Sequence, residues 1–207
     1  MSYRYPNSFI KPGLNTLVAP TPIYTYGLWS WGLNDLGQLG LGNIANKSSP
    51  NQVGALTTWL SVACGQHYTV SIKTDGTLWV WGQNDLGQLG LGNITNYSSP
   101  KQIGLLTTWS KVSAGGYQTM AINSAGTLWG WGYNNVGQLG TGNTTSYSSP
   151  VQIGTSSWTS VSASRSLTTA LTSGTGKLAY TWGTNAQGQI GDGTVTNRSS
   201  QVAIGGI

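Results

Sequence analysis

The sequence predicts an all-β protein built from tandem repeats, each of which contributes four short strands. Three observations carry this prediction: a long segment recurs along the chain, the apolar runs are short and bounded by turn residues, and no stretch shows a helical period. Among 207 residues there are 31 Gly, 10 Trp and 10 Tyr. Disordered chains are poor in aromatic residues, so this composition indicates a folded, turn-rich protein.

Internal repetition is the strongest signal. Residues 34–44 recur unchanged at 84–94, a relative follows at 134–143, and a fainter one lies at 185–191. The first three copies are spaced by fifty residues and the last by fifty-one. Periods of 20–50 residues are typical of solenoids, propellers and other arrays.

Within one repeat, four apolar segments read as strands, here named a, b, c and d. In the second repeat these are residues 78–82, 98–103, 109–114 and 117–122. Trp79 and Trp81 of strand a lie two residues apart and so share one face. The Asp75-Gly76 pair predicts a tight turn between strand d and the next strand a.

Four strands per period describe a blade of a β-propeller, whose small sheets bury their faces against neighbouring blades. Large indole rings are suited to fill the space between blades. The pattern Leu-Trp-x-Trp-Gly-x-Asn-x-x-Gly-Gln-Leu-Gly, followed by Ser-Ser-Pro-x-Gln-Ile and Trp-x-x-Val, resembles the RCC1 repeat and covers residues 27–207. The Trp-Asp pair of WD40 repeats and the paired glycines of kelch repeats do not occur in this pattern.

The residues that carry the resemblance recur at the same place in every repeat. They are Trp31, Gly32, Gly37, Gln38, Gly40, Trp81, Gly82, Gly87, Gln88, Gly90, Trp131, Gly132, Gly137, Gln138, Gly140, Trp182, Gly183, Gly188, Gln189 and Gly191. We expect them to have a structural role in the repeat.

The resemblance implies a ring, yet the strand count does not reach one. Starting at Leu28, the chain runs through strands a to d three times and ends with a and b, which is about three and a half to four four-stranded blades. We expect either a closed small ring or a partial propeller, with strands c and d missing at the C-terminal end. Residues 15–26, a second copy or another protein are alternative ways to cover the open edge, because an exposed strand edge invites association.

Residues 1–26 belong to no repeat, so we divide the chain into an extended N-terminal arm at 1–26 and a propeller at 27–207. The arm is rich in proline, which favours an extended chain. It is interpreted either as a surface-packed tail or as a docking arm. The candidate docking residues are Tyr3, Tyr5, Phe9, Ile10, Tyr24 and Tyr26.

We predict that the chain is not an enzyme and that it has no catalytic, cofactor-binding or metal-binding residues. His67 is the only histidine and is expected to be packed and hydrogen-bonded, because no nucleophile–base set accompanies it. Cys64 is the only cysteine and is expected to be buried in a strand. Together they are too few to ligate a metal.

Charge and composition narrow the classes of partner. The net charge of +5 arises from nine Lys and Arg against four Asp, and the bases are scattered rather than clustered. A nucleic-acid partner is therefore not favoured. No apolar run is long enough to span a bilayer, and the N-terminus lacks the core of a signal peptide, so we expect synthesis in the cytoplasm.

The leading hypothesis is a phage or virus virion component, such as a tail, fibre or capsid-surface protein that mediates assembly or host attachment. A charge-poor, Ser/Thr/Asn-rich surface without a secretion signal suits a protein that folds in a host cytoplasm and then lies on a virion surface. The alternative is a cytoplasmic RCC1-like adaptor for another protein, such as a small GTPase, and a third is binding of a surface glycan. The nucleotide-exchange activity and chromatin contact of RCC1 itself are not expected to carry over, because fold alone does not determine function.

Overall fold

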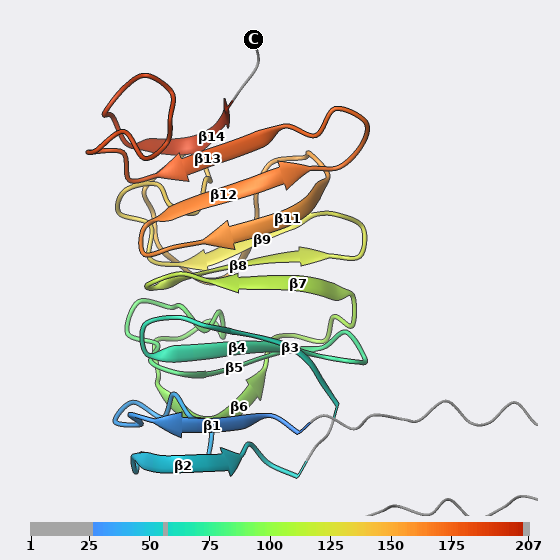
Figure 1. Cartoon of the computed structure of the whole chain (residues 1–207), viewed down its shortest axis with the longest axis vertical. Coiled ribbons are helices and arrows are strands. Elements are labelled where there is room, and N and C mark those ends of the chain that lie inside the picture. The colour runs from blue at the N-terminus through green and yellow to red at the C-terminus, as the bar shows by residue number, and fades with distance from the viewer. Residues whose placement is uncertain (1–26, 56–57, 205–207) are drawn as a thin grey trace, which may run out of the picture.

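The computed structural model describes residues 27–55 and 58–204, which form fourteen strands in four antiparallel sheets (Figure 1). The first seven strands are β1 (Trp29–Gly32), β2 (Lys47–Gln52), β3 (Trp59–Cys64), β4 (Tyr68–Lys73), β5 (Leu78–Gly82), β6 (Tyr97–Gln102) and β7 (Trp109–Ala114). The others are β8 (Gln118–Asn123), β9 (Leu128–Gly132), β10 (Tyr147–Gln152), β11 (Trp158–Ala163), β12 (Leu167–Thr172), β13 (Ala179–Gly183) and β14 (Arg198–Ile204). The four strands expected in each repeat are thus present to within one residue in the second repeat.

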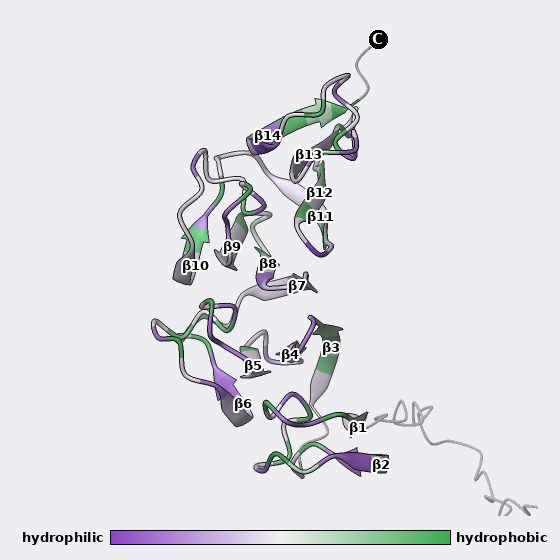
Figure 2. Ribbon diagram, turned by 90° about the vertical axis from the view of Figure 1, so that its left-hand side faces the viewer, coloured by the Kyte–Doolittle hydropathy of each residue, from purple (hydrophilic) through white to green (hydrophobic). Residues whose placement is uncertain are grey.

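The blades are out of phase with the sequence repeat. Each complete sheet takes strands c and d from one repeat and a and b from the next, in the orders β3-β4-β5-β6, β7-β8-β9-β10 and β11-β12-β13-β14. Strands β1 and β2 form a two-stranded sheet of their own. The four sheets follow one another along the long axis of the molecule (Figures 1 and 2).

The expectation that the array stops half a blade short at its C-terminal end is wrong. Because strand d is joined to the next strand a by a tight turn, these two pair, and β14 completes the last blade. The half-blade lies instead at the N-terminal end of the described chain, where β1 pairs only with β2 among the residues described. The predicted arm at 1–26, with its docking residues, lies outside the described residues.

The turn between strands a and b explains why the motif needs Asn and Gly. Asn84 is buried, its side-chain oxygen accepts the Leu89 amide hydrogen at 2.9 Å, and its side-chain nitrogen donates to the Asn93 carbonyl at 2.9 Å. Gly87 and Gly90 have φ angles of +78° and +70°, a region that glycine enters without strain. The same bond to a main-chain amide recurs at Asn34, Asn134 and Asn185.

Each strand b lies at a sheet edge, and each of the first three contains a proline. Proline cannot donate to a sheet ladder, so it is tolerated at edges and bulges. Pro100 of β6 lies in the interval where the register between β5 and β6 shifts. The Ser-Ser-Pro element therefore bends the outer strand of the blade.

The core lies between the sheets. Between the second and third sheets it contains Ile72, Leu78 and Leu89 from one side, and Trp109 and Trp131 from the other. Trp109 meets Trp131 edge-on with ring centroids 6.3 Å apart. Related aromatic pairs occur in the other two complete blades, which confirms the prediction that indoles fill the space between blades.

Candidate protein-interaction surface

One junction geometry is repeated three times along the chain. The indole N–H groups of Trp81, Trp131 and Trp182 each donate to the main-chain carbonyl of a glutamine in the preceding turn, at 3.0 Å in every case. The acceptors are Gln38, Gln88 and Gln138. The motif residues predicted from the repeat therefore meet across the boundary between two blades.

A second contact in each junction joins a glycine to a serine. The amide hydrogens of Gly42, Gly92 and Gly142 are donated to the carbonyls of Ser98, Ser148 and Ser199 at 2.7–2.8 Å. The indole also lies close to a glycine of the preceding turn. A Cβ atom added to Gly90 would lie 2.6 Å from Nε1 of Trp131, so no larger residue fits there.

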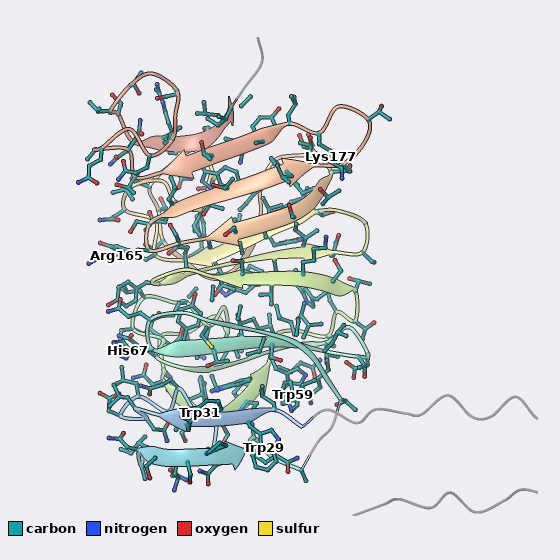
Figure 3. All side chains as sticks on the ribbon, viewed as in Figure 1. Trp29, Trp31, Trp59, His67, Arg165 and Lys177 are labelled. Atoms are coloured by element: carbon teal, nitrogen blue, oxygen red, sulfur yellow. The ribbon has the colours of Figure 1, made fainter. Side chains whose placement is uncertain are left out.

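The first copy of this tryptophan has nothing to pack on among the described residues. Trp31 is 60% exposed, whereas Trp81, Trp131 and Trp182 are at most 1% exposed. Trp29 is 52% exposed and Ser48 is exposed, while Ser98, Ser148 and Ser199 are half-buried. We call Trp29, Trp31 and Ser48 the N-terminal end face; Figure 3 shows both tryptophans on the half-blade.

The other end of the array exposes the complementary half of the junction. Gly188, Gln189 and Gly191 are exposed, whereas the equivalent Gly137, Gln138 and Gly140 are buried. A Cβ added to Gly188 would meet nothing within 4 Å, and one on Gly191 would meet only the Ile204 side chain at 3.9 Å. We call Gly188, Gln189 and Gly191 the C-terminal end face.

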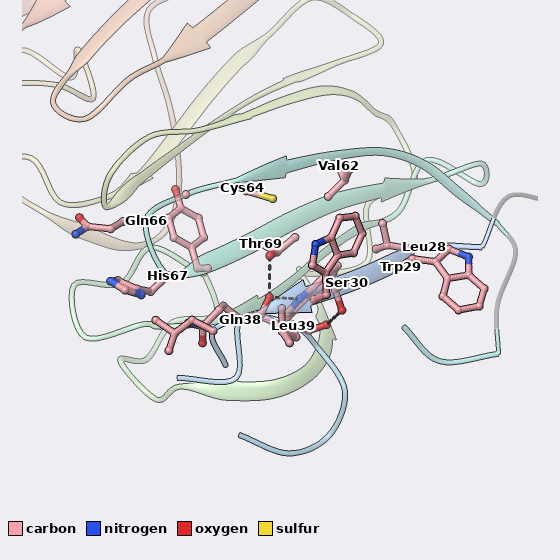
Figure 4. Close-up of a pocket in the computed structure, with 15 residues that line it drawn as sticks. Leu28, Trp29, Ser30, Gln38, Leu39, Val62, Cys64, Gln66, His67 and Thr69 are labelled. Atoms are coloured by element: carbon pink, nitrogen blue, oxygen red, sulfur yellow. Dashed lines mark hydrogen bonds between the residues drawn. The ribbon is translucent and has the colours of Figure 1, made fainter. Parts of the chain in front are cut away.

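A groove of about 370 Å³ opens between the half-blade and the first complete blade (Figure 4). Its lining includes Leu28 and Ser30 of the half-blade and Val62, Cys64 and Thr69 of the facing blade. The Thr69 hydroxyl donates to the Gln38 carbonyl at 2.9 Å and ties the two sheets together. The groove lies beside β1, where complete blades carry strands c and d.

The groove explains why Cys64 is exposed, which contradicts the expectation of a buried thiol. The equivalent Ala114 packs against the cluster between the second and third sheets, because a complete blade covers it. Val62 is likewise 49% exposed. The repeat pattern alone gave no sign of this, since a strand residue is covered only if the preceding blade has all its strands.

The turns between strands c and d line up on one side of the stack. The Gln66 amide donates to the Gly116 carbonyl at 3.3 Å, and the Gly116 amide donates to the Ser164 carbonyl at 3.2 Å. His67 and Arg165 lie on this side, and Lys177 lies on the opposite side (Figure 3). His67 is half-buried, and its main-chain carbonyl accepts the Gln83 amide hydrogen at 2.9 Å.

No group of three or more His, Cys, Asp or Glu could hold a metal ion in residues 27–55 and 58–204. Burial lowers the pKa of Lys73, whose ammonium lies 3.5 Å from the centre of the Trp79 ring. The same part of the chain contains no helix long and apolar enough to cross a membrane.

The sequence that forms the repeated junctions and the four-stranded sheets matches a known repeat family. The pattern of the regulator of chromosome condensation (RCC1) repeat matches residues 27–72, 75–122 and 125–171. The chain belongs to the RCC1 repeat family. A second RCC1 repeat pattern matches residues 59–88 and 109–138.

Known proteins resemble parts of this RCC1-repeat chain. A protein RCC2 homolog from Danio rerio is 38% identical over 53 residues, which is 25% of this chain and 11% of that protein. Human WBSCR16 superposes with a TM-score of 0.74 and 23% identity, over 87% of this chain and 48% of that one. Prp20p from Saccharomyces cerevisiae superposes with a TM-score of 0.75 and 20% identity, over 87% and 46%.

The chain therefore spans less than half of each of these two solved structures. The fold is a partial RCC1-type propeller, which confirms the all-β repeat architecture and the family expected from the motif.

Proposed function

We propose that this chain is a non-catalytic binding module that recognises other protein chains through the uncovered N-terminal end of its array. The observation that carries the proposal is the exposure of Trp31 at a position that is buried in every later repeat. Aromatic side chains that stand exposed on a rigid surface are typical anchors of protein interfaces. The solved structure of Prp20p, which shares this fold, is described with its binding to other proteins, and this supports the same conclusion.

The chemistry of this end suits a protein partner. Trp29, Trp31 and Leu33 are about half exposed on the half-blade, and Leu60 and Val62 are exposed on the facing blade. The indole N–H of Trp31 offers a hydrogen-bond donor for a main-chain carbonyl, as its equivalents do within the chain. A partner with an apolar turn and a free carbonyl satisfies both features.

The solved structure of Prp20p is described together with its binding properties to Gsp1p and histones. These two ligands therefore form the first panel of protein ligands for this chain. We expect micromolar or tighter binding of a protein ligand to immobilised chain, and at least tenfold weaker binding to the Trp31→Ala variant. A Leu105→Ala variant is the control, because Leu105 is 93% exposed and lies in the connection between β6 and β7, outside the half-blade.

Two results would contradict the proposal. Binding that is equal in wild type and Trp31→Ala would remove the end face from the interface. Hits on a glycan array, without any protein ligand, would favour carbohydrate binding by Trp29 and Trp31 instead.

The virion hypothesis stays a prediction supported by composition: 6% charged residues and an abundance of small polar ones. Mass spectrometry of purified particles from the source of this sequence tests it. Detection of the chain at fixed stoichiometry would support a structural role in the particle, and its absence from particles would exclude one.

A further inference from the structure

The two ends of the described array present the two halves of one junction. Trp81, Trp131 and Trp182 are the equivalents of Trp31 in the later repeats. Each of them packs on the preceding turn between strands a and b, which is the equivalent of the turn at residues 188–191. At the ends, Trp31 has no such turn and the last turn has no such tryptophan among the described residues. What is buried at each internal junction is thus exposed once at either end of the array formed by residues 27–55 and 58–204.

We propose that the N-terminal end face of one copy docks on the C-terminal end face of a second copy. This inference rests on the proposed function and names the partner of that end. Trp31 takes the place of Trp182 in the junction, and its indole N–H donates to the Gln189 carbonyl of the other copy. The Ser48 carbonyl then accepts the Gly193 amide hydrogen, as the Ser199 carbonyl accepts that of Gly142.

The space at the C-terminal end face fits this occupant. Gly191 has a φ angle of +79° and Gly140 one of +77°, so the two turns have the same backbone conformation at this point. The Gly188–Gln189–Gly191 turn is held by the same amide-to-carbonyl bond, from Gly191 to Gly188 at 3.1 Å, that joins Gly140 to Gly137 at 2.9 Å. The receiving surface is therefore formed before a partner arrives.

Apolar surface supports the same contact. Ile122 and Ile153 are buried in the junction between the third and fourth sheets. Their equivalents at the C-terminal end, Leu171 and Ile204, are 37% exposed and half-buried. None of the six residues that define the two end faces is ionisable, and Asp192, between Gly191 and Gly193, is paired with Arg198.

The contact joins two different surfaces, so it is head-to-tail, and every open assembly keeps one free end face of each kind unless a ring closes. Sedimentation velocity therefore measures a mass that rises with concentration above the 21.7 kDa of one chain. Trp31→Ala removes the N-terminal half of the contact, and Gly191→Ala places a methyl group where the incoming indole must lie, as the 2.7 Å distance from a Gly140 Cβ to Trp182 Nε1 indicates. Each variant alone is expected to stay at the mass of a single chain.

Gly104→Ala is the control for Gly191→Ala. Both glycines have left-handed φ angles, +55° and +79°, so both substitutions strain the backbone. A Cβ at Gly104 meets nothing within 4 Å, and Gly104 belongs to neither end face. Gly104→Ala is therefore expected to associate as wild type does.

Mixing the two blocked variants gives the decisive measurement. Trp31→Ala keeps an intact C-terminal end face and Gly191→Ala keeps an intact N-terminal end face, so their mixture is expected to form a one-to-one complex of two chains and nothing larger. A wild-type chain that stays single at all concentrations, a Gly191→Ala variant that associates normally, or a mixture that stays single would each overturn the inference. If wild type is single yet binds another protein through Trp31, the inference fails while the proposed function stands.

Discussion

The phenol of Tyr68 donates a 2.5 Å hydrogen bond to the main-chain carbonyl of Gln118, which belongs to the next blade. The hydroxyl of Thr119 donates to the Tyr68 oxygen at 3.2 Å. Tyr68 and Gln118 are both fully buried, and burial raises the pKa of Tyr68 far above its ordinary value of 10.0. This pair links the first and second complete blades in the core.

Removing the phenol oxygen tests the link. Tyr68→Phe leaves the buried Gln118 carbonyl without this donor, and we expect a loss of about 1–3 kcal/mol in the free energy of unfolding in urea. Tyr133→Phe is the control, since Tyr133 is only half-buried, whereas Tyr68 is fully buried. A loss of less than about 0.5 kcal/mol in Tyr68→Phe would show that the bond contributes little.

The raised pKa of Tyr68 predicts a loss of stability at high pH. The unfolded chain releases this proton near pH 10.0, whereas the folded chain keeps it. The stabilisation is therefore complete below that pH and decreases as the pH rises above it. Unfolding free energies measured from pH 8 to 11 should fall more steeply for wild type than for Tyr68→Phe. Parallel pH dependence in the two proteins would contradict the prediction.

The same substitution at equivalent positions of different repeats should change the free energy of unfolding by different amounts. Trp131 is fully buried, so Trp131→Ala is expected to cost about 3–5 kcal/mol. Trp31 is mostly exposed, so Trp31→Ala is expected to cost less than about 1 kcal/mol when measured on the single chain by urea unfolding. Equal losses would mean that Trp31 is covered in the folded chain.

Alanine substitutions at two glycines with a left-handed backbone distinguish the cost of backbone strain from the cost of steric crowding. Gly104 and Gly90 have φ angles of +55° and +70°, so alanine at either position costs about 1–2 kcal/mol in strain. A Cβ on Gly104 meets nothing, but one on Gly90 would lie 2.6 Å from Trp131 Nε1. Gly90→Ala should therefore lower the free energy of unfolding by about 1–3 kcal/mol more than Gly104→Ala does. Similar melting temperatures for the two variants would show that the turn moves aside freely.

The turn of the last blade carries an acidic residue, Asp192, where the earlier turns have Leu41, Leu91 and Thr141. The Thr194 hydroxyl donates to Asp192 at 2.7 Å and Arg198 pairs with it at 2.6 Å, and together they lower the pKa of Asp192 to about 2 from 3.8. The pair is present above pH 3.8 and is lost as the pH falls towards 2. In carboxyl NMR titrations Thr194→Val should raise this pKa towards 3.8. An unchanged pKa would assign the shift to Arg198 instead.

Much of this fold could be predicted from the sequence, because the same residue types recur at the same positions of successive repeats. Trp81, Asn84, Gly87 and Gly90 each occur at positions that need an indole, an amide or a left-handed backbone, and the structure places them so. The family followed from the same residues.

The phase of the blades and the exposed ends could not be predicted in the same way. A periodic sequence does not say where one sheet ends and the next begins, since every choice of starting strand gives the same period. Trp31 and Trp131 share a motif and differ only in whether a preceding turn covers them. The exposure of Cys64 has the same origin, because it depends on strands outside its own repeat.

The offset between repeat and blade also determines how the molecule would respond to a protease. A cut in the turn after Ser124 divides the chain between β8 and β9, in the middle of a sheet. Strand β9 would remain paired with β8 from Leu128 to Gly132, and β10 would remain paired with β9. The two products would thus stay associated as a nicked but folded molecule, and two separately made halves that meet at this turn should assemble with each other.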